Sequence, residues 1–308
     1  MSIASQFDIA VIGGGVAGLT AVQHALQGGC SVAHILGTEP IGGLVCNVGE
    51  LQGYPAGEQP ISGIALACSL MAANAELGAT EIMSDATALC RDGSSFRLET
   101  SEGELLAGQV IAATGARLRM LDMPSARDLI GRGVSQCAWC DGALYKDKDV
   151  VVVGGGDAAL EEALHLAQIA AKVTLVTRGD GFRARRSYVN RIVDHETANI
   201  RRMSDVVEIV GSNGVEAIRI FDRASGATEE LACSGVFVFI GLEPNSTLLA
   251  EHVKLDSDGR VETTEVMQSA TPGLFAIGSV RSGYRGRLVH AVGEAATAAM
   301  AAVSRCAQ

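Results

Sequence analysis

The sequence is poor in the features that mark several protein classes. Only 4% of its 308 residues are aromatic, and Lys+Arg 24 are outnumbered by Asp+Glu 35, which gives a net charge of −11. A nucleic-acid-binding surface needs basic residues that displace counterions from phosphates, so this balance argues against nucleic acid as a partner. No hydrophobic run approaches the roughly 18 residues of a membrane helix. We therefore expect a soluble protein with no membrane partner.

Cysteine is also sparse, with 8 residues in the chain. This number is too low for a disulfide scaffold, and only Cys137 and Cys140 have the spacing of a motif. No second CxxC or nearby Cys/His pair completes a set of four zinc ligands, so no metal site is expected. The N-terminus lacks the basic segment of a signal peptide. These features predict a cytoplasmic protein with mostly reduced thiols.

Glycine is abundant, at 37 residues, and hydrophobic residues make up 48% of the chain. Domains of roughly 100–200 residues are common, so this length suggests about two of them. The strongest sign of organisation is a repeat of a buried strand, a glycine turn and a helix. The first copy places residues 7–12 before GGGVAG, from Gly13 to Gly18, and the second places residues 149–153 before GGGDAA, from Gly154 to Ala159.

This pattern is typical of the opening of a dinucleotide-binding βαβ unit. The first glycine allows a tight turn, the second lets the backbone approach a pyrophosphate, and the third position must be small for helix and strand to pack. These positions are Gly13, Gly15 and Gly18 in the first copy and Gly154, Gly156 and Ala159 in the second. Two ordinary βα turns are the alternative, but two copies in the same context favour nucleotide binding.

The remaining strand patterns indicate that one nucleotide domain interrupts the other. Strand-like runs cover residues 95–100, 104–107, 109–113, 235–240 and 273–277, and an alanine-rich helix starts at about Ala291. We predict an α/β protein with two Rossmann-like dinucleotide-binding domains, the second inserted into the first. The first comprises residues 1–116 and 243–308, and the second comprises residues 117–242.

The sequence CAWCDG at residues 137–142 is the chemical centre of the chain. Two cysteines three positions apart come within bonding reach across one helical turn, and such pairs often hold a reactive thiolate. Asp141 follows directly and is a candidate for the proton carrier in thiol–disulfide exchange. Two buried thiols at chance spacing are the alternative, which leaves the acid and the glycine after them unexplained.

Several motifs together resemble low-molecular-weight thioredoxin reductases over nearly the whole chain. They are GRGVS at residues 131–135, CAWCDG, the second glycine turn with Glu161 and Glu162, AATG ending at Gly115, and IGLEPN at residues 240–245. The resemblance implies FAD in the first domain, a pyridine nucleotide in the second, and a redox disulfide between Cys137 and Cys140. It further implies that Cys140 faces the flavin, Cys137 attacks the external disulfide and Asp141 is the acid/base. A homodimer and a rotation between domains are also implied.

The same resemblance assigns residues to the cofactors. Besides the glycine turns, the residues expected at FAD are Glu39, Gly42, Gly43, Thr114, Gly115, Gly278 and Ser279. Arg178 and Arg183 match two of the family's three arginines for the 2′-phosphate of NADPH, while Gly179 replaces the third. We expect NADP(H) to be preferred, and we expect Arg185 and Arg186 to lie on a solvated helix face.

Departures around the expected flavin site keep a second function open. Leu44, Gly53, Ser279 and Gly286 stand where the family has polar side chains. The leading prediction is a reductase that passes electrons from NAD(P)H through FAD to a disulfide, with a thioredoxin-like protein as partner. The alternative is a flavin-dependent oxidase that forms a disulfide in a small-molecule dithiol, with oxygen or NADP as acceptor. Asp141 and the second nucleotide fold favour the reductase.

Overall fold

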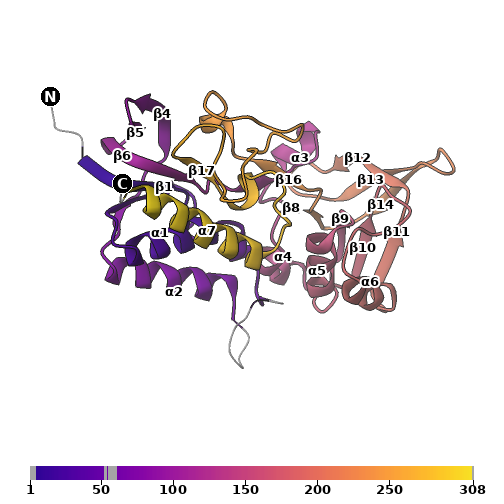
Figure 1. Ribbon diagram of the computed structural model, residues 1–308. Helices are drawn as coiled ribbons and strands as arrows, with labels where there is room; N and C mark the ends of the chain where they lie inside the picture. The colour runs from indigo at the N-terminus through magenta and orange to yellow at the C-terminus, as the bar shows by residue number, and fades with distance from the viewer. Residues whose placement is uncertain (1–4, 52–53, 55–60, 307–308) are drawn as a thin grey trace. The chain divides into compact units, whose positions relative to one another are not determined.

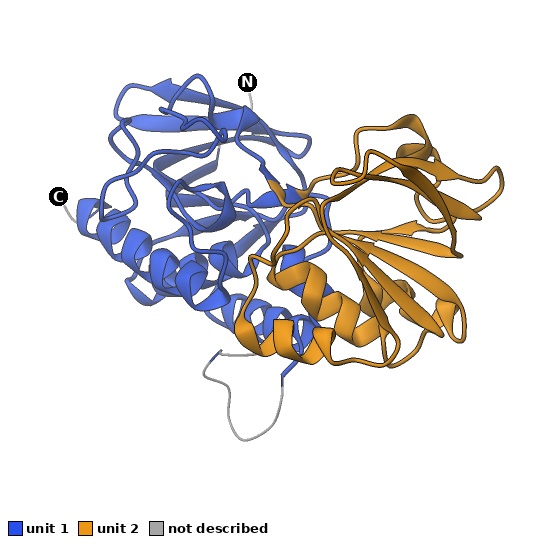
Figure 2. Ribbon diagram, turned by 90° about the vertical axis from the view of Figure 1, so that its right-hand side faces the viewer, with its two compact units in different colours: residues 1–117, 243–308 blue, residues 118–242 orange. Residues whose placement is uncertain are grey.

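The computed structural model describes residues 5–51, 54 and 61–306 (Figure 1). Gly53, one of the departures noted above, lies outside them. The chain forms two compact units: a first unit of residues 1–117 and 243–308, and a second unit of residues 118–242 (Figure 2). The strands β7 (Ala116–Leu118) and β16 (Leu242–Pro244) pair where the chain passes from one unit to the other. Within the described residues, no helix is both long enough and apolar enough to span a bilayer.

The first unit is built on a seven-stranded sheet in the order β3-β2-β1-β6-β5-β4, with β17 also paired to β6. Its strands are β1 (Ser5–Ile12), β2 (Val32–Ile35), β3 (Thr80–Ile82), β4 (Ala86–Asp92), β5 (Ser95–Thr100), β6 (Gly103–Ala112) and β17 (Leu274–Ala276). Strands β1, β2, β3, β6 and β17 run parallel, and the β4–β5–β6 part is an antiparallel meander.

The α-helices among the described residues of the first unit are α1 (Val16–Gln27), α2 (Gly63–Glu76) and α7 (Leu288–Cys306). Helix α1 packs against both α7 and α2 (Figure 1). The contact with α7 is made by small residues, because Ala295, Ala298 and Ala302 are completely buried in a core shared with Val22 of α1. Their short side chains let the two helices approach closely.

The second unit is built on a parallel sheet in the order β11-β10-β9-β15-β8. These strands are β8 (Val134–Ser135), β9 (Asp149–Val153), β10 (Lys172–Val176), β11 (Ala198–Arg201) and β15 (Gly235–Val238). A separate antiparallel sheet contains β12 (Ser204–Val210), β13 (Ala217–Asp222) and β14 (Thr228–Ala232). The helices are α3 (Pro124–Asp128), α4 (Ala138–Asp141), α5 (Asp157–Leu166) and α6 (Arg186–Val193).

The strand sequences explain why these sheets form. Strand β9 reads DVVVV with its four valines buried, because α5 and α6 cover one face of the sheet and α3 with β12 and β13 covers the other. The predicted α/β class with an inserted second Rossmann-like sheet is confirmed. Some bounds differ: the runs at residues 104–107 and 109–113 belong to the single strand β6, the run at residues 235–240 forms the shorter strand β15, and the last helix begins at Leu288.

The parallel sheet of the second unit also positions its functional groups. The glycine turn follows the carboxyl end of β9, and the CxxC segment follows the carboxyl end of β8. In open parallel sheets, ligands bind at this edge. The topology therefore brings two motifs to one edge of one sheet.

Candidate active site

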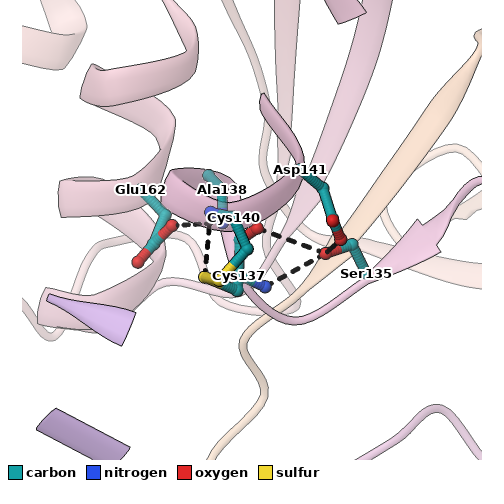
Figure 3. The surroundings of a disulfide bond; sticks show 6 residues. All are labelled: Ser135, Cys137, Ala138, Cys140, Asp141 and Glu162. Atoms are coloured by element: carbon teal, nitrogen blue, oxygen red, sulfur yellow. Dashed lines mark hydrogen bonds between the residues drawn. A yellow bond between two sulfur atoms is a disulfide. The ribbon is translucent and has the colours of Figure 1, made fainter. Parts of the chain in front are cut away.

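The two motif cysteines form a disulfide. Cys137 is the N-cap of α4 and Cys140 lies within that helix, with Cα atoms 5.3 Å apart and an S–S distance of 2.10 Å (Figure 3). The backbone N–H of Cys140 donates to the Cys137 sulfur at 3.1 Å. Cys137 is only 8% exposed, whereas Cys140 is exposed. One cysteine of the pair is therefore exposed and the other is buried.

Asp141 is held beside the disulfide by a serine that precedes it. The hydroxyl of Ser135 donates to the Asp141 carboxylate at 2.6 Å and accepts from the backbone N–H of Cys137 at 3.1 Å (Figure 3). Ser135 is the last residue of β8 and only 8% exposed, so its position is fixed by the sheet. One side chain therefore connects the expected proton carrier to the backbone of the redox pair. Sequence reasoning assigned Ser135 no role.

The helix α5 packs against α4 and contacts it through two polar side chains. The carboxylate of Glu162 accepts from the backbone N–H of Ala138 at 2.7 Å, and Trp139 stacks on His165 with ring centroids 3.7 Å apart. Glu162 is 7% exposed, and this burial raises its pKa to about 7. Burial lowers the pKa of His165, which favours the neutral ring. Glu162 and His165 are three positions apart, so both lie on the α5 face that contacts α4.

The first glycine turn has the geometry of a pyrophosphate site. A Cβ on Gly13 would lie 2.2 Å from the carbonyl oxygen of Ala113, and a Cβ on Gly18 would lie 2.0 Å from that of Gly13. At Gly15, in contrast, the nearest atom to a Cβ is 3.9 Å away, in Gly42. Gly15 is the N-cap of α1 and no side chain caps that helix end. Free N–H groups, a positive helix end and space at Gly15 fit the diphosphate of FAD.

A buried histidine fixes this turn from the neighbouring strand. The Nε2–H group of His34, on β2, donates to the carbonyl of Gly13 at 3.1 Å. His34 is completely buried, and desolvation lowers its pKa to about 4, which keeps the ring neutral at pH 7. Sequence reasoning missed His34, because a single histidine within a hydrophobic strand carries no motif.

The other residues expected at FAD divide into two groups. Gly42 and Gly43 border the turn, since the N–H of Gly42 donates to the carbonyl of Gly14 at 2.8 Å and a Cβ on Gly43 would lie 3.5 Å from Gly15. Glu39 is exposed in the loop after β2. These three residues lie in the segment that follows the strand carrying His34.

The second group comes from later strands of the same sheet. Thr114 is joined to Asn245 by two hydrogen bonds of 2.7 and 2.9 Å, and the N–H of Asn245 donates to the carbonyl of Gly115 at 3.0 Å. Gly278 packs against α1, because a Cβ on it would lie 3.1 Å from that of Ala17. The hydroxyl of the next residue, Ser279, forms a hydrogen bond with Tyr284.

The second glycine turn repeats this geometry in the second unit. A Cβ on Gly154 would lie 2.3 Å from the carbonyl oxygen of Phe239, whereas nothing lies within 4 Å of a Cβ on Gly156. Gly156 is the N-cap of α5, which also lacks a side-chain cap. Ala159 is completely buried, as the third small position requires. This turn fits a second dinucleotide.

The arginines after β10 have different surroundings. Arg178 and Arg183 are exposed, and the N–H of Arg183 donates to the carbonyl of Gly155 at 2.8 Å. Arg185 was expected on a solvated helix face, and that expectation is wrong. It pairs with Asp157 at 3.2 Å and its guanidinium lies 4.2 Å from the centre of the Tyr188 ring. The charge of the acid at the first position of α5 attracts this arginine toward the glycine turn.

Comparisons with known proteins agree with this arrangement. The family model described as pyridine nucleotide-disulphide oxidoreductase matches residues 7–302. The chain is 34% identical over 300 residues to the thioredoxin reductase of Treponema pallidum, covering 97% of each protein. It is also 34% identical to the thioredoxin reductase of Bacillus subtilis, covering 97% of this chain and 94% of that one.

The chain is also similar to a solved thioredoxin reductase structure. The chain is similar to Lactococcus lactis thioredoxin reductase in its FR conformation, with a TM-score of 0.93 and 30% identity over 98% of this chain and 99% of that one. The resemblance inferred from the motifs is therefore confirmed. The chain is an oxidoreductase that belongs to the pyridine nucleotide-disulphide oxidoreductase family.

Proposed function

We propose that this chain reduces the disulfide of a thioredoxin-like protein. It is an FAD-dependent thiol–disulfide oxidoreductase, and its cofactors are FAD and NADPH. The observation that carries the proposal is the Cys137–Cys140 disulfide, in which Cys140 is an exposed residue and a carboxylate is held nearby by Ser135. An exposed cysteine is suited to exchange with a protein disulfide.

The first unit is proposed to hold FAD. Its diphosphate would lie on the N–H groups at the start of α1, in the space that Gly15 leaves. The remaining residues proposed around it are Gly13, Gly18, Glu39, Gly42, Gly43, Thr114, Gly115, Gly278 and Ser279. When bound, FAD relays an electron pair between NADPH and the redox disulfide.

The second unit is proposed to hold NADPH. The diphosphate would lie at Gly156 and the start of α5, with Gly154 and Ala159 shaping the turn. Arg178 and Arg183 are exposed and follow β10, which is the second strand of this βαβ unit. We assign both cations to the 2′-phosphate.

The solvent exposure of the two cysteines favours different roles for them than the family resemblance implied. We assign the outward attack to Cys140, because Cys140 is an exposed residue whereas Cys137 is 8% exposed. The Cys140 thiolate would attack the substrate disulfide and form a mixed disulfide, and one substrate thiolate would leave. Asp141 would supply the proton that this leaving group takes up. Attack of the Cys137 thiolate on Cys140 would then release the second substrate thiol and restore the disulfide.

Anaerobic reduction of the purified protein tests this function. NADPH should bleach the flavin absorbance of the native protein, and oxidised thioredoxin added afterwards should restore it. Cys140→Ser should still be bleached by NADPH but should not support thioredoxin reduction. Cys90→Ser is the matched control, because Cys90 is an exposed free thiol on β4, and it should behave as the native protein.

Opposite electron flow would contradict the proposal. Bleaching of the flavin by a small dithiol, followed by recovery in air with release of peroxide, would identify a dithiol oxidase. Failure of NADPH to bleach the flavin would exclude the proposed reductase function. We further propose a homodimer located in the cytosol, for which the support is the family resemblance.

A further inference from the structure

Glu162 is a buried carboxyl group that the exchange steps above do not use. It projects from α5, is 7% exposed and accepts the backbone N–H of Ala138 at 2.7 Å (Figure 3). The backbone N–H of Trp139 bonds to it as well. Glu162 thus binds the first two N–H groups of α4, the helix that carries the redox pair.

A charged group is not needed to satisfy these N–H groups. A helix of four residues leaves its first N–H groups without intrahelical partners, and a neutral amide oxygen can also accept from such a group, through a weaker bond. A carboxyl differs from an amide in that it can gain and lose a proton. Burial raises the pKa of Glu162 to about 7, so both protonation states are accessible near neutral pH.

Reduction of the disulfide changes the charge at the same helix end. Cys137 immediately precedes Ala138, and its sulfur accepts the N–H of Cys140 at 3.1 Å. A reduced pair near neutral pH holds one sulfur as a thiolate. Two negative groups would then share the start of α4, and repulsion between them disfavours the doubly charged state.

We propose that Glu162 is a positioning residue whose protonation is coupled to the redox state of the Cys137–Cys140 pair. Two electrons and two protons convert the disulfide and the Glu162 carboxylate into one thiol, one thiolate and one protonated carboxyl. Reoxidation returns both electrons to the oxidant and releases both protons. In the cell, the electrons for this reduction would come from NADPH through FAD, which rests on the proposed function. In the test tube, an external dithiol can supply them instead.

The surroundings of Glu162 contain few other titratable groups. On its own helix, Glu161 raises its pKa further and is itself hydrogen-bonded to Tyr188 of α6, while His165 stacks on Trp139. On α4, Asp141 is held by Ser135. The strands that α5 packs against contribute valine, leucine and phenylalanine side chains. A comparison that changes only Glu162 therefore isolates its contribution.

Equilibrium titration of the disulfide tests the coupling. Native protein and Glu162→Gln are equilibrated anaerobically with reduced and oxidised dithiothreitol between pH 6 and pH 8.5, quenched with an alkylating agent, and the oxidised fraction of the pair is measured by mass spectrometry. Glutamine keeps an oxygen for the N–H of Ala138 and stays neutral. The two proteins should agree at pH 6, and the variant should be easier to reduce by about tenfold at pH 8.5, which equals about 30 mV.

Controls separate this result from a structural effect. Glu161→Gln makes the same chemical change one residue away and should keep the shape of the native pH dependence, displaced to lower pH because the Glu161 charge raises the pKa of Glu162. Glu162→Ala removes the acceptor and should change the equilibrium at every pH. Parallel curves for native protein and Glu162→Gln, whether superimposed or offset by a constant, would overturn the coupling. Dithiothreitol reduces the disulfide directly, so the titration needs no electron transfer from NADPH through FAD and no thioredoxin. Its outcome is therefore independent of whether the proposed function is correct.

Discussion

Acidification should destabilise the first unit through His34, the histidine beneath the first glycine turn. Its ring is completely buried, donates to the carbonyl of Gly13, and has a pKa lowered to about 4 by desolvation. In the unfolded chain its pKa is about 6.5, so the unfolded state binds the proton more readily. The neutral ring therefore stabilises the fold fully above pH 6.5, and this contribution is lost as the pH falls from there toward 4.

The size of the effect follows from proton linkage. Between pH 7.5 and pH 5, a group with these two pKa values loses about 2 kcal/mol of unfolding free energy. For a unit of this size, such a loss lowers the melting temperature by about 4–8 °C. The glycine turn that His34 supports should be lost in the same transition.

Thermal unfolding at matched ionic strength measures this loss. His34→Gln can donate its amide to the carbonyl of Gly13 but does not titrate, so its melting temperature should fall less than that of the native protein on acidification. The matched control is His24→Gln, at a histidine that is only partly buried on α1, and it should keep the native pH dependence. Equal losses in His34→Gln and the native protein between pH 7.5 and pH 5 would refute the reasoning.

Three further predictions address the cofactors and the proton carrier. Gly15→Val should yield protein without FAD, measured by the flavin absorbance per chain, because the side chain fills the space of the diphosphate; full occupancy would disprove that placement. Ser135→Ala should slow thioredoxin reduction about tenfold, since Asp141 loses its donor, while bleaching by NADPH continues; native turnover would show that the serine is not needed. Arg178→Ala should raise the KM for NADPH about tenfold and leave that for NADH nearly unchanged; equal increases would show that it does not bind the 2′-phosphate.

Local patterns were sufficient to predict the architecture. Each glycine turn is defined by a few consecutive residues, and the buried strand before it and the helix after it are also local features. The insertion could be predicted because the glycine turn recurs at Gly154 and strand patterns continue beyond it. The spacing of Cys137 and Cys140, together with the acid and the glycine that follow them, likewise predicted the redox pair.

The residues that support these motifs were not predictable, because they are distant in the sequence. Glu162 lies 24 residues from Ala138, and His34 lies 21 residues from Gly13. Sequence reasoning noted Glu162 only as part of a motif. The misplacement of Arg185 has the same origin, since its partner Asp157 belongs to another helix. Contacts of this kind follow from the way parallel strands and their helices assemble, which no short motif encodes.

The insertion of the second unit has a consequence for the order in which the chain can fold during synthesis. The ribosome completes residues 118–242 before it makes β17 and α7, which belong to the first unit. Domains generally fold as units once their residues have emerged, so the second unit can form its sheet while the first still lacks a strand and a helix. Until α7 arrives, the apolar face of α1 that packs against it has no cover. The incomplete first unit therefore exposes hydrophobic surface during this interval, and such surface makes a nascent chain prone to aggregate.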